Sequence, residues 1–261
     1  MIGKVIVLGI VQGLTEFLPV SSTGHLIVLE RLFGFSESEF GILFDVMLHG
    51  GTLLALVVYF WTDLVKIGRD LIGNYRKNGR LPALLLVGTV PGVLVGVFFE
   101  GFISGNLRNS IVVGACLILF SGVFYLGERV SKKNKEIGKL SLVDGVVIGL
   151  FQAVALVPGV SRSGITITGG LFRNLKREEA GRFAFLLSIP IVLGAFLAKS
   201  LVLVEGGNGV EFMCYSLIGF LASFLTGVLV IRFFMKYLKK HNMDVFLVYR
   251  VILGLLILLL L

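Results

Sequence analysis

Two short polar stretches decide how this chain folds. They are Pro19-Val20-Ser21-Ser22-Thr23-Gly24-His25 and Pro158-Gly159-Val160-Ser161-Arg162-Ser163-Gly164. Each interrupts an apolar stretch, 2–33 or 142–172, near its middle, so each apolar stretch predicts two half-length helices joined at a polar turn. Non-helical backbone at membrane depth is tolerated only where protein or a water-filled cavity surrounds it. We therefore expect two re-entrant helical hairpins whose turns meet at a site.

The composition around these stretches is that of a membrane protein. Of the 261 residues, 56% are hydrophobic and 15% are charged, against about 25% charged in a soluble domain. The mean hydropathy is +0.97. A soluble fold has too little polar surface to cover so many apolar side chains, which excludes a water-soluble globule and a disordered chain. The net charge of +8 does not indicate a nucleic-acid partner, because the exposed surface for one is missing.

Six further segments are long and apolar enough to span a bilayer, which takes about 20 residues. They are roughly 41–61, 82–99, 110–127, 183–204, 212–234 and 245–261. With the two hairpins, the predicted fold class is an all-α membrane protein. We expect a single polytopic domain over 1–261.

The two interrupted stretches match each other when the sequence is shifted by 140 positions. Leu8-Gly9-Ile10-Val11-Gln12 then falls on Ile148-Gly149-Leu150-Phe151-Gln152, and the two polar turns align at Val-Ser and Gly. This indicates an internal duplication of one hairpin plus three spans. Repeat one covers about 1–128 and repeat two about 141–261, joined by a basic cytoplasmic loop at about 128–140. Because three spans cross the bilayer and a hairpin does not, the repeats are predicted to have inverted topology.

Charge gives this layout an orientation. Eighteen of the 24 Lys and Arg residues fall in connections on one predicted face, called the basic face here. They are Lys66, Arg69, Arg76, Lys77, Arg80, Arg129, Lys132, Lys133, Lys135, Lys139, Arg173, Lys176, Arg177, Arg182, Arg232, Lys236, Lys239 and Lys240. Because positive loops stay in the cytoplasm, we expect a multi-pass protein of the inner (plasma) membrane with both termini on the outer face.

The predicted turns carry polar groups that are costly at membrane depth and usually functional there. Glu16 and His25 belong to the first hairpin and Arg162 to the second. Hydroxyls accompany them at Ser21, Ser22, Thr23, Ser161, Ser163 and Thr166. Hydroxyl-rich turns that open a helix expose backbone N–H groups to an anion, and arginine recognises phosphate in a bidentate manner.

Glu16 indicates more than anion trapping, because a carboxylate beside phosphate can carry a divalent metal or move a proton. His25 can serve as acid, base or nucleophile. The bland interpretations remain open: Gln12 and Gln152 can simply bridge the hairpins by hydrogen bonds. Asp45, His49 and Asp144 are expected to cap helices at the membrane interface.

The run from Gln12 through Glu16 to His25, and the run from Pro158 to Thr166, resemble the two signature segments of a known family. It is the bacitracin-resistance type of integral membrane undecaprenyl pyrophosphate phosphatase. The resemblance covers essentially the whole chain. The family pattern begins with Glu or Gln, and this chain has Gln12 there. The motif therefore offers one carboxylate to a metal instead of two, and Glu16 carries more of the role.

The resemblance implies hydrolysis of undecaprenyl pyrophosphate to undecaprenyl phosphate and inorganic phosphate at a site open to the outer face. It also implies a role in cell-wall synthesis, bacitracin tolerance and dependence on a divalent cation, Mg or Ca, with Glu16 as the metal ligand. Its critical residues carry over to Glu16, Ser22, His25 and Arg162. Supporting substrate contacts are implied at Ser21, Thr23, Ser161, Ser163 and Thr166, and Gln12 joins them as a binding residue. The partners are the polyprenyl pyrophosphate lipid and membrane lipids, and the Gly-rich faces also allow a homodimer.

Two routes of attack remain open. In one, Ser22 attacks phosphorus with His25 as base, because their three-residue spacing places both on one helix face. In the other, His25 activates water directly. The competing function is a transporter or flippase for a phosphorylated lipid or small anion, because inverted repeats with broken helices are typical of transporters. A purely structural membrane scaffold is a third alternative, in which Glu16 and Arg162 would be dispensable.

Overall fold

The computed structural model describes residues 1–34, 42–72, 80–205 and 210–260, and within these ranges the fold is built from helices without a strand. Arg76 and Lys77 of the basic face lie outside the described residues. The elements are α1 (Ile2–Thr15), α2 (Ser22–Phe33), α3 (Ile42–Tyr59), α4 (Trp61–Ile72), α6 (Arg80–Phe102), the π-helical turn η1 (Ile103–Leu107), α7 (Ser110–Val130), the 3-10 turn η2 (Ile137–Lys139), α8 (Leu142–Val154), α9 (Arg162–Phe172), α10 (Arg177–Glu205), α11 (Val210–Lys240) and α12 (Asp244–Leu260).

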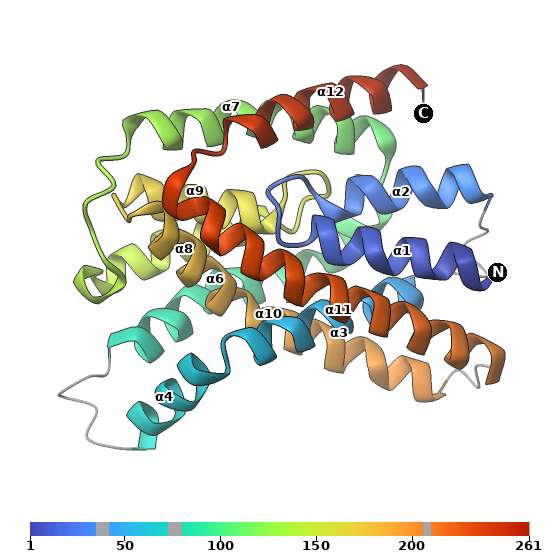
Figure 1. The fold of residues 1–261 in the computed structure, drawn as a ribbon, viewed down its shortest axis with the longest axis horizontal. Helices are drawn as coiled ribbons and strands as arrows, with labels where there is room; N and C mark the ends of the chain where they lie inside the picture. Colours follow the sequence, from blue (N-terminus) through green and yellow to red (C-terminus); the bar gives the residue numbers. More distant parts are fainter. Residues whose placement is uncertain (35–41, 73–79, 206–209, 261) are drawn as a thin grey trace.

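Both interrupted stretches fold as pairs of short helices, α1 with α2 and α8 with α9. Each second helix starts one residue after a serine with positive φ, Ser21 at 70° and Ser161 at 75°. The hydroxyl of each accepts a bond from the backbone N–H three residues on, at Gly24 and Gly164. A capping side chain and a left-handed backbone therefore end each turn and begin each helix. The two turns lie next to each other near the centre of the molecule (Figure 1).

Among the described residues, four helices are long and apolar enough to cross a membrane: the joined α6–η1 segment, α7, α10 up to Lys199, and α11. The predicted span at 41–61 corresponds to α3, which is followed by a bend of 74° into α4. The α4 helix has a polar and an apolar face. From the apolar face, Leu64 and Ile67 pack against the main hydrophobic core. The last predicted span forms α12, which has 17 described residues, against 21 in the shortest of the other four.

Close packing of the first helix of each hairpin against a long helix holds the hairpins in place. The α1 helix packs on α11, and α8 packs on α6. Gly9 and Gly149 permit this: a Cβ on Gly9 would lie 2.6 Å from the carbonyl oxygen of Gly219, and one on Gly149 would collide with the carbonyl of Gly88. Small residues at such crossings let helix backbones meet where water provides no driving force. The two short helix pairs therefore pack against long helices. The α7 and α12 helices lie side by side, and α7 contacts α2 and α9, the helices that follow the turns (Figure 1).

The connections of the basic face are tied together by ion pairs. Glu128, whose whole residue is 2% exposed, pairs with Arg177 and, at 3.3 Å, with Lys133. Asp144 pairs with Arg173 and completes a capping box with Ser141 at the start of α8, which confirms the capping role expected of Asp144. These bonds fasten the 128–140 connection to the start of α10.

Candidate active site at the two turns

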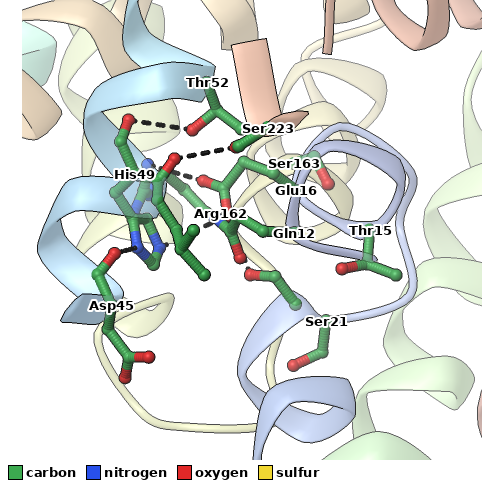
Figure 2. A network of polar contacts seen from close by, with 12 residues as sticks. Gln12, Thr15, Glu16, Ser21, Asp45, His49, Thr52, Arg162, Ser163 and Ser223 are labelled. Atoms are coloured by element: carbon green, nitrogen blue, oxygen red, sulfur yellow. Dashed lines mark hydrogen bonds and ion pairs between the residues drawn. The ribbon is translucent and has the colours of Figure 1, made fainter. Parts of the chain in front are cut away.

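Glu16 is the centre of the polar network between the turns. It ends α1, where its backbone N–H bonds to the carbonyl of Gln12, and its side chain is 9% exposed. Four side chains from three parts of the chain converge on its carboxylate (Figure 2). A buried carboxylate is costly without compensating bonds. The four contacts to Glu16 supply such bonds and stabilise its charged form.

The contacts to Glu16 divide between its two oxygens. One guanidinium nitrogen of Arg162 lies 3.1 Å from Oε1. The hydroxyl of Ser22 donates to Oε2 at 2.8 Å, and the amide nitrogen of Gln12 donates to the same oxygen at 3.1 Å. Nε2 of His49 lies 3.5 Å from Oε2. The structure therefore brings Glu16, Ser22 and Arg162 of the sequence-derived set together.

A pocket with an empty volume of about 360 Å³ opens beside this network. It is lined by Thr15, Glu16, Ser21, Ser22, Thr23, His49, Ala155, Val157, Gly159, Ser161 and Arg162. The N-termini of α2 and α9 both reach it, at Ser22 and Arg162. Free N–H groups of a helix's first turn and the positive end of its dipole attract anions. The pocket thus combines two helix N-termini, an arginine and hydroxyls, which is the chemistry that binds phosphate.

His25 does not line this pocket. Its Nδ1 is hydrogen-bonded to the backbone carbonyl of Ser21 at 2.7 Å, and its Nε2 lies 2.6 Å from the hydroxyl of Tyr249. Its ring also stacks on the Tyr249 ring. The structure does not bring His25 and Ser22 together as the three-residue spacing predicts, because the Ser22 hydroxyl, on the first residue of α2, is bonded to Glu16 while both ring nitrogens of His25 have other partners.

The remaining predicted binding residues take different positions. Ser21, Thr23 and Ser161 line the pocket. Ser163 instead donates to the carbonyl of Leu18 at 3.0 Å and so ties one turn to the other. Thr166 is 1% exposed, and its hydroxyl has no hydrogen-bond partner among the described residues.

His49 is a residue of this pocket that sequence reasoning placed at the membrane interface instead. It lies in α3, and its Nδ1 donates to the carbonyl of Asp45 at 2.8 Å. Because a carbonyl only accepts, Nδ1 carries the proton, and Nε2 is directed at Glu16 (Figure 2). Its expected role was capping at the membrane interface. A histidine within an apolar stretch is a sequence signal for a functional site. Its contact with Glu16, however, depends on how α3 is rotated about its axis.

The residues around Glu16 fit a divalent cation only in part. Among the residues that the structure describes, no three His, Cys, Asp or Glu side chains gather to hold a metal. The amide oxygen of Gln12 is buried without a hydrogen-bond partner, and it lies on the side chain that already contacts Glu16. One carboxylate with an amide oxygen suits magnesium, which takes one or two carboxylates and completes its shell with phosphate oxygens and water.

Comparison with known proteins gives a consistent result. Residues 5–256 match the family described as bacitracin resistance protein BacA. An undecaprenyl-diphosphatase of Desulforudis audaxviator is 44% identical over 253 residues, which cover 96% of this chain and 94% of the relative. Proteins of the same name from Rubrobacter xylanophilus and Thermomicrobium roseum are each 42% identical, over 97% of this chain and 96% and 95% of the relatives.

Proposed function

The chain belongs to the family of bacitracin resistance protein BacA, and from that premise we propose that it hydrolyses undecaprenyl pyrophosphate to undecaprenyl phosphate and inorganic phosphate. It is a multi-pass membrane hydrolase whose product renews the lipid carrier for cell-wall synthesis. The single observation that carries the site assignment is the meeting of Glu16, Ser22 and Arg162 at a pocket between two helix N-termini.

Arg162 and the two helix N-termini bind the pyrophosphate in this proposal. Their positive charge opposes the charge that spreads over the phosphoryl oxygens in the transition state. The Glu16–Arg162 contact keeps the guanidinium directed at the pocket before substrate arrives. Ser21, Thr23 and Ser161 add hydroxyls and backbone N–H groups around the phosphates.

The hydrogen bond from Ser22 to Glu16 supports a revised nucleophilic route. The Ser22 oxygen attacks the terminal phosphorus, its proton passes to Glu16, and the bond to the lipid phosphate oxygen breaks. Water then hydrolyses the phosphoserine and releases inorganic phosphate. Direct attack by water with the same carboxylate as base is the alternative route. His25 supports the start of α2 from its place beside Tyr249.

A divalent cation, Mg or Ca, is part of the proposal. Glu16 and the amide oxygen of Gln12 would hold it together with oxygens of the substrate. Such a cation neutralises pyrophosphate charge and polarises the phosphoryl group. This chain's own contribution is a single carboxylate, so we expect weak binding of metal without substrate and tighter binding with it.

The membrane arrangement we propose is an inverted repeat with two re-entrant hairpins and six spans. Several features that correspond at the 140-residue shift support it: Ser21 with Ser161 in backbone conformation, and Gly9 with Gly149 in packing. Both chain ends lie away from the 131–141 connection of the basic face (Figure 1). We place that connection in the cytoplasm and the termini, with the mouth of the pocket, on the outer side of the plasma membrane.

Phosphate release in detergent tests this function. A hydrolase releases inorganic phosphate from solubilised undecaprenyl pyrophosphate, whereas a transporter or flippase needs a sealed membrane. We expect release without a membrane, and loss of that release on adding a chelator. Movement of labelled lipid phosphate across vesicles without phosphate release would support the transporter instead. Sedimentation of the purified protein decides between a monomer and a homodimer.

A further inference from the structure

Arg250 is a fully buried arginine in the middle of α12, with 0% of its residue exposed. Buried arginines are normally paired with a carboxylate. Among the residues that the structure describes, no carboxylate forms an ion pair with Arg250. The hydrogen-bond partners of its guanidinium are therefore neutral groups. This indicates that the arginine is there for the hydrogen bonds that it donates.

The partners of Arg250 come from both turns and from α7. It donates to the carbonyl of Gly159 at 3.1 Å and reaches that of Pro19 at 3.5 Å. It also donates to the hydroxyl of Ser121 at 3.2 Å and approaches the carbonyl of Cys116 at 3.4 Å. The guanidinium carbon lies 4.7 Å from the centre of the Phe124 ring, a stabilising cation–π contact.

The two turn carbonyls occupy equivalent places in their hairpins. Pro19 and Gly159 are separated by the same 140 positions as Ser21 and Ser161. Pro19 lies between Glu16 and Ser22, and Gly159 lies three residues before Arg162. A shift of either carbonyl therefore moves one half of the polar network relative to the other. Two further side-chain bonds join the hairpins at this point, from Ser163 to the carbonyl of Leu18 and from Arg162 to Glu16.

We propose that Arg250 is a positioning residue that holds the two turns at the separation at which Glu16 and Ser22 face Arg162. The inference rests on the active site proposed above. It assigns to α12 a role in the alignment of the reacting groups, in addition to its packing against α7.

Only arginine suits this role. Its guanidinium is planar, stays charged and carries five donors in a fixed arrangement, so one side chain can reach carbonyls that point at it from different elements. A lysine at 250 offers one ammonium at the end of a flexible chain and cannot reach both turns at once. Methionine fills a similar volume without any donor.

The experiment compares Arg250→Lys, Arg250→Gln and Arg250→Met with the unchanged protein in detergent. Thermal unfolding and size-exclusion profiles establish that each variant is folded, and phosphate release from undecaprenyl pyrophosphate gives kcat and KM. We expect kcat to fall by about 10²-fold, as for reacting groups displaced by about 1 Å, with a much smaller change in KM. Arg129→Met is the matched control, because Arg129 joins α7 to Asp244 of α12 at the exposed end of the same helix pair. It should keep normal turnover.

A double-mutant cycle separates alignment from general damage. If Arg250 acts through the alignment of Arg162, then Arg250→Lys should cost much less kcat when Arg162→Lys is already present. Normal turnover in folded Arg250→Lys or Arg250→Met overturns the inference, as do fully additive losses in the cycle or failure of all three variants to fold. Normal turnover in Arg162→Lys alone would instead reject the proposed site, so the two failures are distinguishable.

Discussion

The guanidinium of Arg162 lies 3.1 Å from the carboxylate of Glu16, although 146 positions separate the two residues in the chain. The contact joins the end of α1 to the first residue of α9. It places one acidic and one basic group at the same pocket, where Ser22 also bonds to the acid.

Gln12→Glu should change the response to divalent cation. A second carboxylate one helical turn before Glu16 adds a ligand where the amide oxygen of Gln12 is now buried and unpaired. We expect phosphate release to reach half of its maximum at a lower Mg²⁺ concentration than in the unchanged protein. Binding of Mn²⁺, followed by its electron paramagnetic resonance signal, should tighten in parallel. An unchanged Mn²⁺ affinity would remove Gln12 from the proposed metal site.

Ser22→Ala should abolish the covalent intermediate. Acid quenching of the protein with substrate labelled in its terminal phosphate is expected to leave label on Ser22 of the unchanged chain and none on the variant. The matched control is Ser216→Ala, because the Ser216 hydroxyl is buried in α11 without a hydrogen-bond partner among the described residues. Full turnover in Ser22→Ala would contradict the serine route and favour direct attack by water.

His49→Asn is expected to lower kcat more than Tyr249→Phe does. Nε2 of His49 lies 3.5 Å from Oε2 of Glu16, and the ring lines the pocket, so we expect a loss of about tenfold in rate, which corresponds to about 1.4 kcal/mol. Tyr249→Phe removes only the hydroxyl that bonds to His25, outside the pocket. Steady-state kinetics on both variants decides. The reverse order would mean that His25 takes part directly in the reaction.

Glu128→Gln should lower the free energy of unfolding without changing the residues that line the pocket. The Glu128 carboxylate is buried and holds Arg177 and Lys133. Removing one partner of a buried pair costs about 3–5 kcal/mol, and partial exposure of both cations reduces this to about 2 kcal/mol. Thermal unfolding in detergent should show a clear loss. Glu136→Gln, which breaks an exposed pair with Lys176, serves as the control and should leave the unfolding temperature unchanged.

The sequence supports prediction of the paired short helices and of the turn residues at their junctions, because Pro, Gly and Ser interrupt apolar runs in ways that helices cannot absorb. Glu16, Ser22 and Arg162 stand out for the same reason, as polar groups within apolar surroundings. The inverted repeat and its orientation stay predictions that rest on the 140-residue shift and on the distribution of Lys and Arg.

Other features escape sequence reasoning because they depend on helix rotation and on backbone partners. The contact of His49 with Glu16 requires α3 to present one particular face to α1. The role inferred for Arg250 rests on carbonyls of Pro19 and Gly159, which leave no pattern in the residue types. The spacing of Ser22 and His25 predicts a shared face. Among the described residues the two side chains make hydrogen bonds to other groups, Ser22 to Glu16 and His25 to Tyr249.

The most direct test of the central claim is a double-mutant cycle on phosphate release from undecaprenyl pyrophosphate by purified protein, with Glu16→Gln, Arg162→Lys and the two combined. Because both groups act on one phosphate in one pocket, each single change should lower kcat by at least 10²-fold, and the double variant should lose far less than the product of the two losses. Near-normal release by either single variant, in protein shown to be folded, would contradict the account.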